Sequence, residues 1–264
     1  MGGDPWTMLW HGWLVSVALM LVLWLVQWAK NDAGLVDVGW TLGVGLLTAY
    51  YAVAADGWLP RRLLVLALVS IWAARLAGYI LVDRVVGKTE EDARYQELRR
   101  YFGERAHFWF FWFFESQTIL VVLCSVPMLV LMSNPRPGFS VWEILGVAVW
   151  AMAIAGEIVA DRQLARWRAS PANRGRTCRS GLWRYSRHPN YFFEWLHWWA
   201  YALMGIGAPY GWLTLVGPAL MWLFLVKLTG IAATENHAVK SRADYRDYQR
   251  TTSMFVPWFP KQPA

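Results

Sequence analysis

Seven long stretches of apolar side chains limit this chain to one class of fold. A helix needs about 20 mostly apolar residues to cross the hydrocarbon core of a bilayer, and these stretches are apolar all round. A hydrophobic fraction of 57% is too high for a soluble domain of 264 residues. We therefore predict an all-α, polytopic membrane helix bundle, a single integral membrane domain over residues 1–264. The expected spans are 8–29, 35–56, 63–83, 108–132, 141–161, 191–208 and 212–233.

Positive charges gather in the loops on one side of these predicted spans. If all seven stretches cross the membrane, 21 of the 25 Lys and Arg residues fall on one side. Arg61, Arg62 and Arg136 fall on the other side, and Arg75 lies within a span. Because positively charged loops stay in the cytoplasm, we expect the N-terminus outside and the C-terminus in the cytoplasm. Contact with membrane lipids alone would also explain such loops.

Several familiar sites are missing from the sequence. Cys124 and Cys178 have no metal-ligand spacing, the five histidines show no zinc motif, and we expect no metal. The glycine-rich segment GWTLGVG lacks the strand–turn–helix context of a dinucleotide fingerprint. The basic residues lie in short membrane-flanking loops, so we expect no nucleic-acid partner. Nothing in the sequence requires an oligomer, and a monomer is compatible with it.

The segment after the fifth predicted span is rich in charged side chains. Glu157, Asp161 and Arg168 are spaced four and seven residues apart and therefore share one helix face. The loop 162–187 carries eight arginines and no lysine. Guanidinium groups bind phosphates in bidentate fashion, which lysine does not do. We therefore predict that this loop binds phosphate.

The sequence SGLWRYSRHPNYFFEWLHWW, from Ser180 to Trp199, leads from this loop into the sixth predicted span. Pro189 suits the first turn of a helix, and Asn190, Tyr191 and Glu194 would then project from its first turns. The free N–H groups of a helix N-terminus attract anions. We expect this helix start to form the second part of the same site.

Ionisable residues also occur inside the earlier spans, where they are costly and often functional. Asp37 lies one or two turns into the second predicted span, and Glu115 lies in the fourth. Arg75 and Tyr79 are in the third span, and Arg75 could form a structural ion pair with Asp37. Beyond the last span, Glu235, Tyr245 and Tyr248 fit either an amphipathic surface tail or a binding site.

These motifs carry a family resemblance. SGLWRYSRHPNYFFE resembles the C-terminal signature of the steroid 5α-reductase and sterol reductase superfamily, and isoprenylcysteine carboxyl methyltransferases share a related RHPxY segment. VDVGW, DRQLARWRASPANRGRTC and DYRDYQRTTSMFVPWFPK resemble a bacterial branch described as a domain of unknown function. The specific part of the match covers about 155–259. It implies a bundle in a bacterial inner membrane, in which 1–133 encloses a lipophilic small-molecule substrate and 134–264 binds NADPH.

The resemblance also implies roles for individual residues. The family's cofactor-binding acid and arginine on the fifth helix match Asp161 and Arg168. Its arginine before the GL turn matches Arg176. Together with the residues of the loop, the helix start and the tail, the expected cofactor-binding set is Arg84, Glu157, Asp161, Arg168, Arg174, Arg176, Tyr185, Arg187, His188, Asn190, Tyr191, Glu194, Glu235, Tyr245 and Tyr248.

The substrate end departs from the family's pattern. Steroid 5α-reductases hold the substrate carbonyl with a Gln–Glu pair and a Tyr, whereas this chain has LVDVGW and, by our alignment, Trp72. We expect Asp37 to be the catalytic acid, protonated through burial so that it donates to the carbonyl oxygen. Tyr79 and Arg75 are expected to assist. The predicted function is NADPH-dependent reduction of an activated C=C bond in a steroid-like or other lipophilic substrate.

Two alternatives remain open from the sequence. The first is a methyltransferase that uses S-adenosylmethionine on a lipid or prenyl-thiol substrate. S-adenosylmethionine carries no phosphate, so an arginine-rich loop does not favour this reading. The second is a non-enzymatic membrane protein that binds a sterol or lipid.

Overall fold

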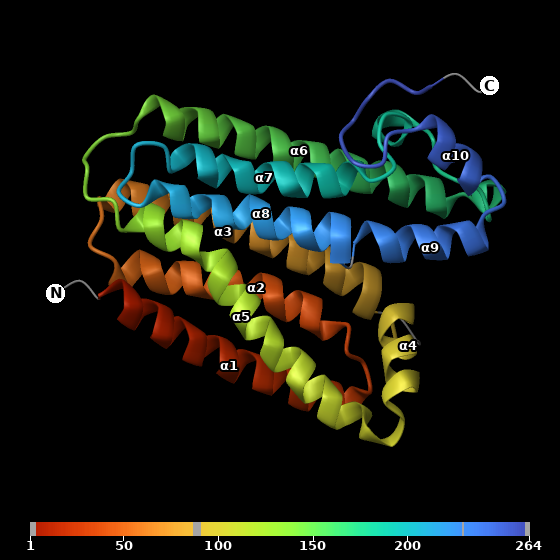
Figure 1. Cartoon of the computed structure of the whole chain (residues 1–264), viewed down its shortest axis with the longest axis horizontal. Coiled ribbons are helices and arrows are strands. Elements are labelled where there is room, and N and C mark those ends of the chain that lie inside the picture. The colour runs from red at the N-terminus through yellow and green to blue at the C-terminus, as the bar shows by residue number, and fades with distance from the viewer. Residues whose placement is uncertain (1–3, 87–90, 229, 262–264) are drawn as a thin grey trace. The chain divides into compact units, whose positions relative to one another are not determined.

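The computed structural model describes residues 4–86, 91–228 and 230–261, and every regular element in these ranges is a helix (Figure 1). The prediction of an all-α fold is therefore confirmed. The α-helices are α1 (Pro5–Lys30), α2 (Leu35–Ala54), α3 (Leu59–Ile80), α4 (Ala93–Phe102), α5 (Ala106–Met132), α6 (Val141–Ala169), α7 (Pro189–Met204), α8 (Val216–Trp222), α9 (Ile231–Ser241) and α10 (Tyr245–Thr251).

Six helical stretches in the described ranges are long and apolar enough to cross a membrane. The chain is thus an integral membrane protein, and the expected number of about seven spans is close. The remaining predicted span, 191–208, corresponds to α7. Its 16 residues extend about 24 Å, which is less than the roughly 30 Å of hydrocarbon in a bilayer. The six stretches are Pro5–Lys30, Leu35–Ala54, Leu59–Asp83, Arg94–Met132, Val141–Ala169 and Gly211–Leu228.

Local sequence signals set the helix ends. The Ser140 side chain accepts a hydrogen bond from the Glu143 backbone N–H, and the Glu143 carboxylate accepts one from Ser140 N–H. This reciprocal capping box starts α6. Pro189 occupies the first turn of α7, as expected. α6 continues to Ala169, beyond the predicted end of its span at 161, so Arg168 is on the same helix as the carboxylates.

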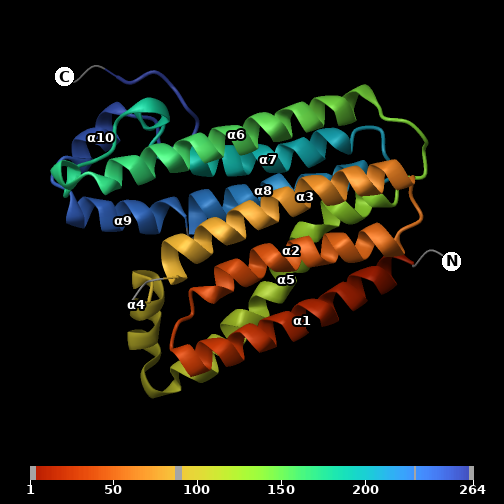
Figure 2. The same ribbon diagram turned by 180° about the vertical axis from the view of Figure 1, so that it is seen from behind.

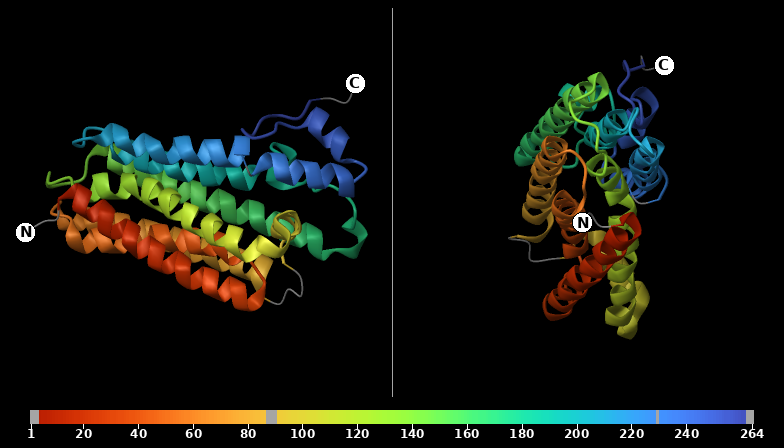
Figure 3. Two further views of the ribbon diagram at one scale, coloured as in Figure 1. Left: turned by 60° about the horizontal axis from the view of Figure 1, so that its bottom comes forward. Right: turned by 90° about the vertical axis from the view of Figure 1, so that its left-hand side faces the viewer.

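The chain divides into two compact units. Unit 1 consists of Met1–Phe139 and Gly207–Val216, and unit 2 consists of Ser140–Ile206 and Gly217–Ala264. Within unit 1, α2 packs against α1, α3 and α5, and α4 runs across the direction of α1 to α3 (Figure 2). Within unit 2, α6 and α7 pack along each other. α10 and the C-terminal segment lie at the same end of this unit as α9 (Figure 3).

The α6–α7 pair depends on a close approach at Gly146. A Cβ atom at this position would lie 2.4 Å from Met204 Cγ and 2.7 Å from the carbonyl oxygen of Ala200. The backbone carbonyl cannot move without shifting α7. We therefore expect Gly146→Ala to lower the free energy of unfolding by about 1–3 kcal/mol, the usual cost of overpacking.

Gly78, on α3, is the matched control for this change. A Cβ atom there would meet nothing within 4 Å, and alanine is the better helix former. Gly78→Ala should therefore leave the thermal midpoint in detergent unchanged or slightly raise it. Equal midpoints for Gly146→Ala and Gly78→Ala would contradict the close packing of α6 and α7.

Candidate functional site

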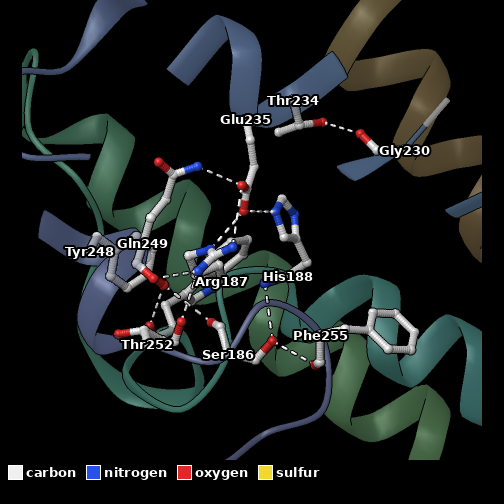
Figure 4. A network of polar contacts seen from close by, with 11 residues as sticks. Ser186, Arg187, His188, Gly230, Thr234, Glu235, Tyr248, Gln249, Thr252 and Phe255 are labelled. Atoms are coloured by element: carbon white, nitrogen blue, oxygen red, sulfur yellow. Dashed lines mark hydrogen bonds and ion pairs between the residues drawn. The ribbon is translucent and has the colours of Figure 1, made fainter. Parts of the chain in front are cut away.

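Arg187 is the centre of a polar cluster at the start of α7 (Figure 4). Its Nε and Nη2 donate to the two carboxylate oxygens of Glu235, at 2.7 and 3.3 Å. Its Nη1 donates to the backbone carbonyls of Gln249 and Thr252, at 2.8 and 2.9 Å. These four bonds use the guanidinium group inside the fold, where it links α9 and α10 to the start of α7. Arg187 was predicted to bind cofactor, and its observed contacts are those of a residue that positions the site.

Glu235 also joins His188 and Gln249. His188 Nε2 is 3.1 Å from Glu235 Oε1, and Gln249 Nε2 donates to Oε2 at 2.7 Å. Burial opposes the ionisation of Glu235, but the hydrogen bonds from His188, Arg187 and Gln249 and the charge of Arg187 outweigh it and lower its pKa to about 2. An ionised carboxylate can only accept hydrogen bonds, so His188 Nε2 must carry a proton. Burial, assisted by the charge of Arg187, lowers the pKa of His188 although Glu235 opposes this shift.

Both shifts predict that acid destabilises unit 2. The unfolded chain binds a proton at His188 below its ordinary pKa of 6.5, which the folded state resists, so stability begins to fall below that pH. The contribution of Glu235 is complete above its ordinary pKa of 4.5 and is lost as the pH falls toward 2. In Glu235→Gln the loss between pH 4.5 and 2 should become smaller, with the part due to Asp244, whose pKa is also lowered, remaining. The variant should also be less stable at neutral pH. Thermal midpoints measured across this range test it, and an unchanged profile would show that Glu235 is not held ionised.

Two predicted tyrosines support the loop before α7. Tyr245 and Tyr248 are buried and pack against each other, with ring centroids 5.7 Å apart. The Tyr248 hydroxyl lies within hydrogen-bond reach of the backbone carbonyls of Trp183 and Ser186, the latter at 3.1 Å. Tyr248 therefore holds the loop before α7, and Tyr245 packs against it, so neither is part of a loose surface tail.

The loop 170–188 is braced from several sides. The Asp244 carboxylate accepts from the backbone N–H and hydroxyl of Thr177, at 3.1 and 2.7 Å. Arg179 Nη2 donates to the Asp244 carbonyl at 2.7 Å, and Gln163 accepts from Leu182 N–H at 2.8 Å. Gly181 takes a positive φ of 60° beside the Gln163 side chain, where a larger residue would not fit. Six arginines of 162–187 are exposed: Arg162, Arg166 and Arg168 on the last turns of α6, and Arg174, Arg176 and Arg184 on the loop.

Buried polar residues continue along the contact between α6 and α7. Asn190 Nδ2 donates to Asp161 Oδ1 at 3.2 Å, and Trp198 Nε1 donates to Glu194 Oε1 at 3.0 Å. Glu157 is buried on the same face of α6 as Asp161. The structure thus joins Asp161 to Asn190 across α6 and α7, and it buries the predicted residues Glu157 and Glu194 on the same two helices.

Other predicted residues lie at the edge of this group. The ring of Tyr191 stacks on that of His188, with centroids 5.4 Å apart. Tyr185 contributes its carbonyl, which accepts from Trp258 N–H at 2.9 Å. The side chain of Arg84 lies outside the part of the chain that the structure describes.

The Asp37 carboxylate in unit 1 has partners that the sequence did not indicate. It accepts from Arg94 Nη2 at 2.9 Å and from the Tyr95 hydroxyl at 3.0 Å. Both donors are on α4, in the basic loop that the charge bias places on one side of the membrane. An acceptor held by a guanidinium and a hydroxyl is not arranged as the proton donor that we expected of Asp37. Tyr79 packs on the cluster formed by Val38, Ala77 and Ile80. Val38 follows Asp37 directly in the sequence.

A second carboxylate fastens the same loop to α1 and α2. Glu91 accepts from Arg99 through both oxygens, at 2.8 and 2.9 Å, and from Ala33 N–H at 2.7 Å. Arg99 Nη2 also donates to Gln27 Oε1 at 3.1 Å. Gln27 is fully buried on α1, so α4 is fixed at both of its ends.

Comparison with known proteins identifies the family but no activity. The chain is 25% identical to an uncharacterised protein of Schizosaccharomyces pombe over 279 aligned positions, which cover 93% of this chain and 78% of the other. No solved structure matches the chain. Residues 23–252 match the family described as a protein of unknown function, DUF1295. Because this match covers most of the chain, including both polar clusters, the chain belongs to the DUF1295 family.

Proposed function

We propose that this chain is an NADPH-dependent membrane reductase of an activated carbon–carbon double bond in a lipophilic, steroid-like substrate. One observation carries the proposal furthest. The loop 170–188 is braced through Thr177, Leu182 and Arg187, while Arg174 and Arg176 remain exposed on it and Arg162, Arg166 and Arg168 remain exposed on the last turns of α6. A rigid display of guanidinium groups suits an anion with several phosphates. The resemblance of these motifs to the steroid 5α-reductase superfamily supports NADPH as that anion.

The residues present fit the chemistry of NADPH. Arg174 and Arg176 are exposed, so their guanidinium groups can hold phosphates, including the 2′-phosphate that distinguishes NADPH from NADH. Asp161 and Asn190 offer a carboxylate and an amide for the polar groups of the cofactor. NADPH would supply the hydride when bound, and the chain would supply orientation and electrostatics.

The substrate end of the proposal rests on unit 1. Reduction of an enone builds negative charge on the carbonyl oxygen, which needs a hydrogen-bond donor in a dry environment. Asp37 is held as an acceptor, so we assign the donor role to hydroxyl or guanidinium groups around it. Tyr79 and Arg75 remain the candidates, because the single hydroxyl proton of Tyr95 is donated to Asp37. We also propose a bacterial inner membrane location, with the N-terminus outside and the C-terminus in the cytoplasm.

Cofactor binding is the first test of this proposal. In detergent, NADPH is expected to raise the thermal midpoint of the protein more than NADH does. In Arg176→Ala the affinity for NADPH should fall about tenfold or more, because a charge-assisted bond contributes about 1.5–3 kcal/mol. Arg250→Ala is the control, since Arg250 is exposed and pairs with Asp247 on α10.

The other outcomes separate the alternatives. A shift with S-adenosylmethionine and none with NADPH would support the methyltransferase and overturn the reductase. No shift with either cofactor would favour a lipid- or sterol-binding protein without catalysis. An NADPH shift that Arg176→Ala leaves unchanged would move the phosphate site away from this loop.

A further inference from the structure

The C-terminal segment after α10 is tied to the turn before α7 by its own backbone. The carbonyl of Ser253 accepts from Arg187 N–H at 2.9 Å, and the carbonyl of Phe255 accepts from Ser186 Oγ at 2.7 Å. Trp258 N–H donates to the carbonyl of Tyr185 at 2.9 Å. The ring of Phe255 is buried, and it contacts those of Phe192 and Trp195 on α7. The course of this segment is therefore fixed as far as these bonds reach.

Three apolar side chains nevertheless point outward from this fixed segment. Val256 is 52% exposed, Trp258 is 70% exposed and Phe259 is 75% exposed. A loose tail could expose such residues by chance, but here the backbone of Trp258 is bonded and the ring of Phe259 contacts Tyr185, with centroids 6.0 Å apart. Adjacent exposed apolar side chains on a fixed scaffold mark an interaction surface. We call Val256, Trp258 and Phe259 the C-terminal aromatic surface.

The position and charge of this surface indicate its partner. Tyr185, to which Trp258 is bonded, lies just before Pro189, where α7 begins. Tryptophan is enriched in membrane proteins at the level of the bilayer interface, where helices enter the membrane. Two exposed cations accompany this contact: Arg184 directly precedes Tyr185, and Lys261 follows Trp258 by three residues. The sequence contains no acidic residue in 162–193 or after Asp247, so the surroundings favour an anionic surface.

We propose that the C-terminal aromatic surface inserts into the interfacial layer of the membrane, and that Arg184 and Lys261 bind the phosphates of anionic phospholipids there. The aromatic rings supply apolar contact with the upper acyl chains, and the two cations supply charge complementarity. Contact with lipid would also hold the segment whose carbonyls bond Ser186 and Arg187. The proposal does not depend on the reductase activity.

A label on Val256 tests the contact with lipid directly. Cys124 and Cys178 are buried, so a Val256→Cys variant can be labelled selectively with an environment-sensitive fluorophore while both aromatic rings remain. The protein is reconstituted in vesicles of phosphatidylcholine, with or without phosphatidylglycerol. We expect quenchers attached to lipid to quench this label strongly and a water-soluble quencher to reach it poorly. The control is Asp247→Cys on α10, an exposed position where the water-soluble quencher should dominate.

The charge requirement is tested with Arg184→Gln/Lys261→Gln in the labelled protein. Lipid quenching should be at least about twofold stronger with phosphatidylglycerol than without it, and the double variant should lose this difference. The same circular dichroism and elution volume for all variants would show that each is folded. Equal access of the water-soluble quencher at positions 256 and 247 would overturn the proposal. Protection of position 256 from both quenchers would also overturn it, because the surface would then be covered by protein.

Discussion

Arg187→Ala is expected to lower the free energy of unfolding by about 3–5 kcal/mol, the usual cost of removing one partner from a buried ion pair. The change leaves the Glu235 carboxylate, with a side chain only 13% exposed, without its guanidinium partner. It also leaves the carbonyls of Gln249 and Thr252 without the donors that they have in the wild type. Arg187→Lys should be intermediate, because an ammonium keeps the charge but cannot span two carboxylate oxygens and two carbonyls.

Arg184→Ala is the matched control for this prediction. Arg184 lies one turn earlier on the same segment and is exposed, so its loss should change the free energy of unfolding by less than about 0.5 kcal/mol. Denaturant unfolding in mixed micelles, followed by circular dichroism, compares the two variants. Similar midpoints for Arg187→Ala and Arg184→Ala would mean that the cluster around Glu235 is not a structural centre.

The long apolar helices could be predicted because their signals are local, whereas α4, α9 and α10 lie in polar segments for which we predicted no helix. Apolar stretches of sufficient length require membrane helices, and residues such as Pro189 and Ser140 mark starts by their backbone chemistry. The exception is α7, where the apolar composition continues to 208 although the helix ends at Met204. Gly205 and Gly207 end the helix there, and the latter takes a positive φ of 79°. Composition measures how apolar a stretch is, whereas helix length depends on where the backbone turns.

The partners of charged residues could not be predicted in the same way. The Asp37 carboxylate bonds Arg94 and Tyr95, which are 57 and 58 positions away in the sequence. The Glu235 carboxylate bonds Arg187 and His188, which are 48 and 47 positions away. No periodicity in the sequence relates such positions, because the pairing depends on how helices pack.

The same limit applies to the eight arginines of the loop 162–187. In the sequence they are equivalent candidates for binding phosphate. In the structure Arg187 is used entirely within the fold, and Arg179 donates to the Asp244 carbonyl, whereas Arg174 and Arg176 are exposed. Burial, which follows from tertiary packing, separates arginines that build the loop from those that remain available for a ligand.

Arg61 shows a structural use of arginine at the other end of unit 1. Its side chain is only 2% exposed, and its guanidinium donates to the backbone carbonyls of Asn134, Arg136 and Gly138, each at 2.9 Å. These carbonyls belong to the loop between α5 and α6, outside any regular element. Arg62 donates in a similar way to the carbonyls of Ala52 and Ala55 at the end of α2, at 3.0 and 2.6 Å. The arginines that depart from the charge bias of the sequence are therefore explained by backbone carbonyls that need donors.

Arg61→Ala is accordingly expected to destabilise unit 1 by about 3 kcal/mol, since each charge-assisted bond contributes about 1.5–3 kcal/mol and water can replace part of the loss at the exposed side of the loop. Arg61→Lys should recover only part of this stability, because an ammonium cannot match the spacing of three carbonyls. Arg136→Ala is the control on the same loop: Arg136 is exposed and its side chain donates to the Gly207 carbonyl, so its loss should cost about 1 kcal/mol or less. Thermal midpoints of the three variants in one detergent compare them. If Arg61→Ala and Arg136→Ala were equally stable, the burial of Arg61 would have to serve some purpose other than holding the loop, and the charge bias would again need a purely topological explanation.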